Sequence, residues 1–223
     1  MTPPALLRLQ AVEIALDGRP LFAPISLQVA PGETATVMGP SGSGKSTLLA
    51  HLCGALAPAF TAKGQAWLGE RRLDGLPPEA RRIGILFQDD LLFPHLSVGQ
   101  NLAFGLPSGL SRAERDRRVA EALADAQLDG FAERDPATLS GGQRARIACL
   151  RTLLAEPQAL LLDEPFSKLD AALKDRFRRF VFEHAAARRL PTLLVTHDPG
   201  DAEAAGGPVI NLSGPAEPPK DAR

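Results

Sequence analysis

The sequence contains no long apolar run and no strong excess of charge of either sign. None of its apolar stretches approaches the roughly 20 residues that a helix needs to cross a bilayer, so any membrane-spanning part would have to come from another polypeptide. The formal net charge of −1 gives no overall reason to expect nucleic acid or an anionic membrane surface as a partner. The first residues, Met1-Thr2-Pro3-Pro4, lack the basic and apolar segments of a signal peptide, and we expect none.

Cysteine and large aromatic residues are also scarce. Cys53 and Cys149 are the only two cysteines, and each stands in an apolar helical pattern far from the other. We therefore expect buried thiols and no disulfide, which suits a reducing compartment. Tyrosine is absent. The 223 residues, 44% hydrophobic and 23% charged, are enough for a sizeable core in one large domain or two small ones.

The most informative stretch is Gly39-Pro40-Ser41-Gly42-Ser43-Gly44-Lys45-Ser46-Thr47, which has the spacing G-x-x-x-x-G-K-[ST]. Its glycines allow a tight curl in which backbone N–H groups approach phosphate oxygens. Lys45 adds a charge near the β- and γ-phosphates, and the Ser46 hydroxyl is suited to ligate Mg²⁺. Residues 35–38 predict a buried strand before this loop, and residues 48–56 predict a helix after it. The stretch therefore predicts a P-loop that binds a nucleotide with magnesium.

The remaining hydrophobic patterns predict an α/β fold with a mostly parallel sheet. Alternation over 6–16 and 25–29 predicts two antiparallel strands joined by a turn. Short apolar runs predict buried strands, and helical spacing predicts helices, one of which begins with a capping box of Ser111 and Glu114. The basic pairs at 71–72 and 81–82 are expected on a solvated face. Further strands are expected at 64–69, 83–87, 159–162, 192–195 and 209–212, and further helices at 96–106, 111–127 and 171–189.

These patterns suggest one domain over residues 1–213, which is an α/β P-loop NTPase with an antiparallel β subdomain and a helical insert. We expect the core to comprise about 1–88 and 155–213, and the helical subdomain about 89–154. The Pro-rich residues 214–223 are expected to be disordered.

Two acidic residues follow the apolar run at 159–162. Asp163 stands at the carboxyl end of that predicted strand, where a Walker B carboxylate reaches the Mg²⁺ site near Ser46. Glu164 comes next and is the candidate to activate a water molecule against the γ-phosphate. Such a pair could instead belong to a turn or a helix cap, but the P-loop upstream favours the catalytic interpretation.

The stretch Leu139-Ser140-Gly141-Gly142-Gln143 narrows the prediction further. Its adjacent glycines let a backbone approach a ligand, and a helix that begins there directs its N-terminal N–H groups outward. Together with the P-loop, Gln88, the Asp163-Glu164 pair and His197, it resembles the nucleotide-binding subunit of ATP-binding cassette (ABC) transporters. The resemblance covers residues 6–213.

The resemblance implies roles for individual residues. Gln88 would contact Mg²⁺ and the attacking water, Glu164 would be the catalytic glutamate, and His197 would hold the γ-phosphate. Ser140, Gly141, Gly142 and Gln143 would contact the γ-phosphate bound by a second copy of the chain, so that two copies enclose two ATP. The run Ser167-Lys168-Leu169-Asp170 matches the D-loop, in which Asp170 would lie near the nucleotide and Lys168 replaces a commoner small residue.

The resemblance also implies partners. The run Leu91-Leu92-Phe93-Pro94-His95-Leu96-Ser97-Val98 resembles the groove for the coupling helix of a separate integral membrane permease, or else it is an apolar seam of the helical insert. A bacterial importer of this kind works at the cytoplasmic face of the inner membrane and receives its solute from a periplasmic or extracellular binding protein. The sequence around Gln88 and Ser140 most resembles that of the ATPase of a three-component importer described as thiamine-like.

One departure concerns the base. The family usually stacks adenine on an aromatic residue where this chain has Leu16, and Phe22 is the nearby aromatic candidate. We expect weak discrimination between ATP and GTP. Two other functions fit a P-loop: a non-transport cassette in translation or DNA repair, and a P-loop kinase. The former usually carries paired cassettes, coiled coils or zinc-binding insertions, none of which is visible in this sequence, and the latter does not explain the run from Leu139 to Gln143.

Overall fold

The computed structural model describes residues 5–212 and 214. The expected disorder of 214–223 therefore lies, except for Gly214, outside the described residues. The strands are β1 (Leu7–Leu16), β2 (Arg19–Pro20), β3 (Ile25–Val29), β4 (Thr34–Met38), β5 (Phe60–Leu68), β6 (Arg71–Arg72), β7 (Ile83–Leu86), β8 (Ala159–Asp163), β9 (Thr192–Thr196) and β10 (Val209–Asn211). The helices are α1 (Lys45–Cys53), α2 (Pro78–Arg81), α3 (Val98–Gly105), α4 (Arg112–Asp125), α5 (Gly141–Leu154), α6 (Ala171–Ala187) and α7 (Pro199–Ala205), with a 3-10 turn η1 (Pro136–Thr138).

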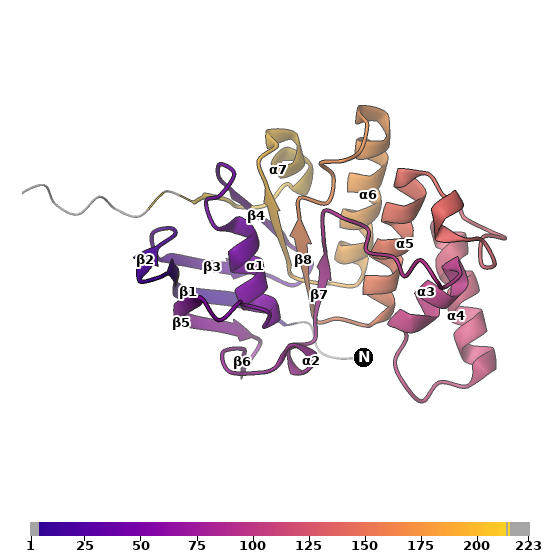
Figure 1. Cartoon of the computed structure of the whole chain (residues 1–223), viewed down its shortest axis with the longest axis horizontal. Coiled ribbons are helices and arrows are strands. Elements are labelled where there is room, and N and C mark those ends of the chain that lie inside the picture. Colours follow the sequence, from indigo (N-terminus) through magenta and orange to yellow (C-terminus); the bar gives the residue numbers. More distant parts are fainter. Residues whose placement is uncertain (1–4, 213, 215–223) are drawn as a thin grey trace, which may run out of the picture.

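The central sheet has the order β10-β4-β9-β8-β7, and all four pairings are parallel. In β8 the residues before Asp163 are all buried, because helices cover both faces of such a sheet and leave no solvated side. Figure 1 shows α1 on one side of β7 and β8, and α5 and α6 on the other. This arrangement confirms the predicted α/β class.

A second sheet is antiparallel and has the order β2-β1-β5-β6, with β3 also paired to β1. Its inner face and the inner face of the parallel sheet share one hydrophobic core, which α1 fills through Leu48, Leu49 and Leu52. On β5, Trp67 lies opposite Arg8, whose guanidinium carbon is 5.3 Å from the centre of the indole ring. The predicted antiparallel subdomain is therefore part of the same core as the P-loop helix.

Helix α5 connects the helical insert to the parallel sheet. Ile147 and Leu150 pack with α3 and α4, whereas Ala148 and Cys149 pack with β8 and α6. Burial raises the pKa of the Cys149 thiol to about 12. Both cysteines are free, as expected, but Cys53 is only partly buried, which differs from the expectation of two buried thiols. Among the residues that the structure describes, no helix is long and apolar enough to cross a membrane.

Only half of the predicted capping box at Ser111 forms. The Ser111 hydroxyl accepts from the Glu114 N–H at 3.2 Å, but the Glu114 carboxylate does not return to Ser111. It accepts instead from Arg117 and Arg118, and these hydrogen bonds lower its pKa to about 2. A carboxylate takes guanidinium partners within reach in preference to a neutral N–H because charge-assisted hydrogen bonds are stronger.

The expectation that all four paired arginines are solvated is wrong for Arg81, which is buried. Its guanidinium donates to the carbonyls of His51, Leu52 and Leu76 at 2.6 to 3.0 Å. The last carbonyls of a helix have no partner within the helix. Arg81 therefore closes the carboxyl end of α1, a contact made across 29 residues of sequence.

Candidate functional site

The P-loop lies between β4 and α1, and its lysine is almost completely buried. Lys45 is 5% exposed, and its ammonium donates to the carbonyls of Gly39 at 2.8 Å and Pro40 at 3.0 Å. Gly44 has a φ of +92°, and a Cβ there would lie 2.9 Å from the ring of Phe22. Only glycine fits both the backbone conformation and the space, so the loop can close over Lys45 only with Gly44 in place.

The next residue along α1 meets the end of β8. The Ser46 hydroxyl donates to Asp163 Oδ1 at 2.9 Å. Burial raises the pKa of Asp163, and this effect outweighs the hydrogen bond from Ser46, which lowers it. A hydroxyl and a carboxylate side by side are hard oxygen donors, and Mg²⁺ is usually bound by one or two carboxylates together with waters and phosphate oxygens. These two residues therefore fit the predicted magnesium site.

Glu164 follows with an unusual backbone conformation. Its φ is +45°, in the left-handed region that non-glycine residues rarely occupy. The Glu164 N–H donates to the Val195 carbonyl on β9 at 3.0 Å, which holds the residue against the sheet. The carboxylate lies 3.8 Å from the Lys45 ammonium through one oxygen and 3.0 Å from His197 Nδ1 through the other. Such strained residues cluster at active sites, and here the strain places a carboxylate between two nitrogen-bearing side chains.

Lys45, Ser46, Asp163 and Glu164 border one cleft of about 560 Å³, whereas His197 contacts Glu164 but is not part of the lining. Most of the predicted P-loop residues line it, together with Gln88 after β7 and the two acidic residues after β8. Parallel strands bring their carboxyl ends to one edge, which explains why residues far apart in sequence meet here. The predicted residues in the lining are Ser41, Gly42, Gly44, Lys45, Ser46, Thr47, Gln88, Asp163 and Glu164. Gly39 and Pro40 contact Lys45, and Ser43 donates its N–H to the Pro40 carbonyl.

The predicted residues at the start of α5 do not line this cleft. Ser140 caps the helix, and Gln143 completes a capping box by accepting from the Ser140 N–H at 2.9 Å. Gly142 is buried, and a Cβ there would lie 2.4 Å from Leu173 of α6, whereas a Cβ on the exposed Gly141 would meet nothing closer than 3.9 Å. Figure 1 shows α1 and α5 separated by β7 and β8.

Asp170 is also occupied elsewhere. Its carboxylate accepts from the Leu173 N–H at 3.0 Å and caps α6, and Asp170 is not part of the lining of the cleft. Lys168, the unusual residue of the same loop, forms an ion pair with Asp89. Arg144 of α5 forms a second pair with the next residue, Asp90, at 3.2 Å. The segment after Gln88 is therefore tied both to α5 and to the loop before α6.

The part of the cleft near Leu16, where the nucleotide base is expected, contains residues that the sequence patterns did not single out. Leu21 and Phe60 line it beside Leu16, and Phe60 is paired directly with Leu16 across β5 and β1. Phe22 is fully buried against Gly44 and cannot stack on a base. The pattern predicted β5 from residue 64, four residues too late to include Phe60. Phe60 could not be identified from the sequence because its place in the cleft depends on the antiparallel pairing of β5 with β1, which brings it opposite Leu16.

The segment 91–98 combines an exposed end and a buried end. Leu91 is 56% exposed, and Val98 is fully buried in the core of the helical insert. Asn101 is buried and donates to the carbonyls of Phe93, Leu96 and Ser97 at 3.0 to 3.1 Å, which shapes the turn. Phe93 contacts Phe104, which is 66% exposed, at 4.6 Å between ring centres. The seam interpretation therefore holds for Val98, while Leu91, Phe93 and Phe104 form a surface that we call the apolar patch.

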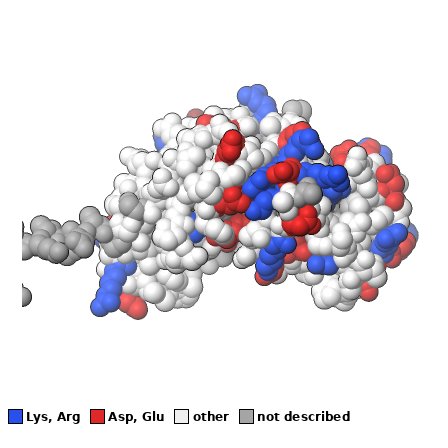
Figure 2. All heavy atoms as spheres, turned by 90° about the horizontal axis from the view of Figure 1, so that it is seen from above, with Lys and Arg blue, Asp and Glu red and all other residues white. Residues whose placement is uncertain are grey.

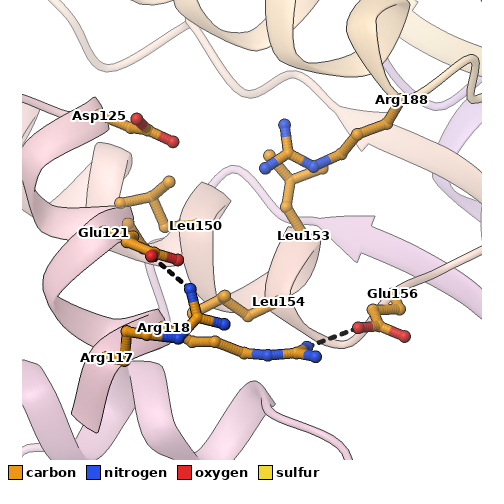
Figure 3. Close-up of a pocket in the computed structure, with 10 residues that line it drawn as sticks. Arg117, Arg118, Glu121, Asp125, Leu150, Leu153, Leu154, Glu156 and Arg188 are labelled. Carbon is orange, nitrogen blue, oxygen red and sulfur yellow. Dashed lines mark hydrogen bonds and ion pairs between the residues drawn. The ribbon is translucent and has the colours of Figure 1, made fainter. Parts of the chain in front are cut away.

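A second cavity, of about 340 Å³, lies between α4, α5 and the end of α6. Figure 3 shows two arginines of its lining paired with carboxylates, Arg117 with Glu121 and Arg118 with Glu156. No predicted site residue lines this cavity. The P-loop cleft remains the candidate site.

Comparison with known proteins agrees with this geometry. Residues 22–167 match the family model described as "ABC transporter". The chain is 51% identical over 199 residues to an Escherichia coli protein named "Uncharacterized ABC transporter ATP-binding protein YnjD", covering 89% of this chain and 92% of that one. It is 46% identical to the "Thiamine import ATP-binding protein ThiQ" of Cereibacter sphaeroides, covering 85% and 81%. It is 44% identical to the "Fe(3+) ions import ATP-binding protein FbpC" of Streptomyces avermitilis. That match covers 92% of this chain and 59% of the relative.

A solved structure supports the same assignment. The ATP-binding cassette MJ0796, in a dimeric post-hydrolysis state bound to ADP and Pi, has a TM-score of 0.75 and 30% identity, covering 92% of this chain and 94% of that one. The resemblance drawn from the motifs is thereby confirmed. This chain belongs to the ABC transporter family, as one of its ATP-binding subunits.

Proposed function

We propose that this chain is the ATP-hydrolysing subunit of a bacterial importer and that it acts as a homodimer with two Mg-ATP between its protomers. It docks on a separate integral membrane permease at the cytoplasmic face of the inner membrane. A periplasmic or extracellular solute-binding protein serves the same permease. The relatives named for Fe(3+), sn-glycerol-3-phosphate and thiamine are all import subunits, which supports import. Their different solutes suggest that specificity resides in the partner proteins.

One observation carries the dimeric site. The P-loop cleft contains Lys45, Ser46, Asp163 and Glu164, whereas Ser140 to Gln143 lie on the other side of β7 and β8. Two copies that face each other in opposite directions bring the start of α5 of one to the cleft of its partner. The exposed N–H groups of that helix suit an anion, and we assign them to the γ-phosphate held across the interface.

Within each cleft the residues have distinct tasks. The Lys45 ammonium and the N–H groups of the loop bind the phosphates, and Ser46 and Asp163 hold the magnesium ion. When bound, magnesium neutralises charge that develops on the phosphate oxygens. Gln88 and Glu164 orient the attacking water, and Glu164 accepts its proton. His197, 3.0 Å from Glu164, holds the γ-phosphate. Catalysis is therefore positional and electrostatic.

The apolar patch of Leu91, Phe93 and Phe104 is the surface that we assign to the permease. Leu91 and Phe104 are exposed and the half-buried Phe93 contacts Phe104, and exposed apolar side chains of this kind are typical of protein interfaces. The Arg151 guanidinium lies over the Phe93 ring and donates to the Leu91 carbonyl at 2.9 Å, so the patch is held in shape. In the sequence, only Asp89 and Asp90 separate the patch from Gln88.

Replacing Phe60 with alanine is expected to weaken ATP and GTP binding by a similar factor. Stacking a base on an aromatic ring is worth about 1–3 kcal/mol and hardly depends on which base is stacked. Leu16 and Leu21 offer no polar group to distinguish the bases. Competition binding of the two nucleotides to the wild type and to Phe60→Ala would measure this. A strong preference for ATP in the wild type, or an unchanged affinity in Phe60→Ala, would contradict this assignment.

Mixing two inactive variants tests the shared site. Lys45→Ala removes the P-loop charge, and Gly141→Asp places a carboxylate where the structure has room for one but where the partner's γ-phosphate is expected. Each variant alone should lack turnover, because both of its sites are defective. The mixture should regain it, because a mixed dimer combines the intact P-loop of one chain with the intact Gly141 of the other.

Gly141→Asn is the matched control, since it adds a neutral side chain of the same size and shape at the same position. It should keep far more turnover than Gly141→Asp. A mixture as inactive as its two components would mean that each chain hydrolyses ATP alone, which would overturn the dimeric site.

A further inference from the structure

A buried ion pair joins α6 to α7 through Asp201, which lies four residues after His197 in the sequence. Asp201 of α7 is 2% exposed, and its Oδ1 accepts from Arg178 Nε of α6 at 2.7 Å. The Arg178 side chain is 12% exposed. Removing either partner would leave a buried charge without its counterion, but a buried pair is weak evidence for stability because desolvation offsets the attraction. The pair is better explained by what else it holds.

The second oxygen of Asp201 is connected to the residues on both sides of His197. The buried Thr196 hydroxyl donates to Asp201 Oδ2 at 2.6 Å, and the same hydroxyl accepts from the Asp198 N–H at 3.0 Å. The carboxylate thus fixes the residue before His197 directly and the residue after it through one hydroxyl. His197 itself is 58% exposed, so its own surroundings do little to restrain it.

Asp198 completes the attachment to α6. Its carboxylate accepts from Lys174 at 2.5 Å and from Arg178 at 3.2 Å, and the hydrogen bond from Lys174 lowers its pKa. Figure 2, which views the molecule from above Figure 1, shows basic and acidic side chains lying side by side near the centre of this face. Lys174 and Arg178 lie on α6, which Asp170 caps, so the His197 segment is fastened to the helix that follows the D-loop.

We propose that Arg178, Asp201 and Thr196 are positioning residues for His197 and that they hold its imidazole beside Glu164 in the orientation that hydrolysis requires. This inference rests on the proposed role of His197 in the function above. None of the three needs to contact the nucleotide.

Thr196→Val is the sharpest test, because it removes only the hydroxyl and keeps the shape of a buried side chain. We expect kcat for ATP hydrolysis to fall on the order of 10-fold, since small misplacements at an active site can cost up to about 100-fold, while KM for ATP stays unchanged. Thr192→Val is the matched control. Thr192 is equally buried on the same strand, and its hydroxyl donates to the Leu190 carbonyl at 3.2 Å, far from His197. It should retain the wild-type kcat.

A double-mutant cycle separates positioning from general damage. In the background of His197→Ala, Thr196→Val should lower kcat no further, because the group that it positions is gone. Arg178→Lys, which keeps the charge but lacks the guanidinium that contacts both Asp201 and Asp198, should lower kcat less than Arg178→Gln. Arg179→Lys on the exposed side of α6 should have no effect.

Two results would overturn the inference alone: a Thr196→Val kcat equal to that of Thr192→Val, or a residual kcat of His197→Ala that Thr196→Val lowers by the same factor as in the wild type. A His197→Ala variant with normal turnover would instead remove His197 from the proposed function, and the inference would fall with it.

Discussion

Replacing Glu164 with glutamine should lower ATP turnover by about 10²- to 10⁴-fold while ATP-driven dimerisation is kept. The amide has nearly the same shape as the carboxylate, so the strained backbone and the contact with Val195 remain. It cannot accept a proton from water, however, and its charge beside Lys45 and His197 is lost. Losing a negative charge next to the γ-phosphate should favour binding, so the variant should accumulate in the ATP-bound dimeric state.

Sedimentation with and without Mg-ATP, together with steady-state hydrolysis, measures both halves of this prediction. Glu203→Gln, an exposed carboxylate on α7, is the control and should behave like the wild type. Unchanged hydrolysis in Glu164→Gln would exclude Glu164 as the catalytic base. A variant that stays monomeric in Mg-ATP even when the permease is supplied would instead contradict the two-chain site.

Replacing Lys45 with alanine should nearly abolish nucleotide binding. Lys45 is the buried cation of the cleft, and truncating one member of a buried charge pair costs about 2–5 kcal/mol, which is roughly 30- to 4,000-fold in affinity. The substitution also leaves the carbonyls of Gly39 and Pro40 without their donor. Both effects act on the phosphates, so ATP and ADP should be weakened together.

Equilibrium binding of a labelled nucleotide measures the loss, and the unfolding temperature of each variant shows whether the fold is kept. Lys63→Ala provides the control for removing a lysine, because Lys63 is 80% exposed on β5 and pairs with Glu13 at 3.5 Å, away from the cleft lining. Lys63→Ala should bind ATP normally. Normal affinity in Lys45→Ala would contradict the assignment of the P-loop.

The parts of this molecule that could be predicted are those in which spacing or strand order alone determines the outcome. The P-loop has a fixed spacing. Asp163 follows a short apolar run, and in a chain that contains a P-loop such a run predicts a buried strand. The carboxyl ends of parallel strands share an edge, so Gln88, Asp163 and Glu164 had to approach Lys45. Motif spacing and strand order were therefore sufficient to predict that these residues meet.

What could not be predicted depends on contacts between distant side chains. The sequence pattern predicts Arg81 as a surface charge, but in the fold it binds free carbonyls at the end of α1. The pattern predicts Glu114 as part of a capping box, but two arginines bind its carboxylate instead. Phe60 enters the cleft only through the pairing of β5 with β1. Arg178 and Asp201 are separated by 23 residues, and nothing in their immediate neighbours indicates that they meet.

The position of Trp67 has a practical consequence for spectroscopy. With no tyrosine in the chain and one tryptophan, near-ultraviolet emission comes almost entirely from a single indole on β5 beneath Arg8. Its intensity therefore follows the melting of the antiparallel sheet, while far-ultraviolet dichroism follows the helices of the whole molecule. If the two optical signals change at one temperature, the sheet and the helices unfold as a single cooperative unit.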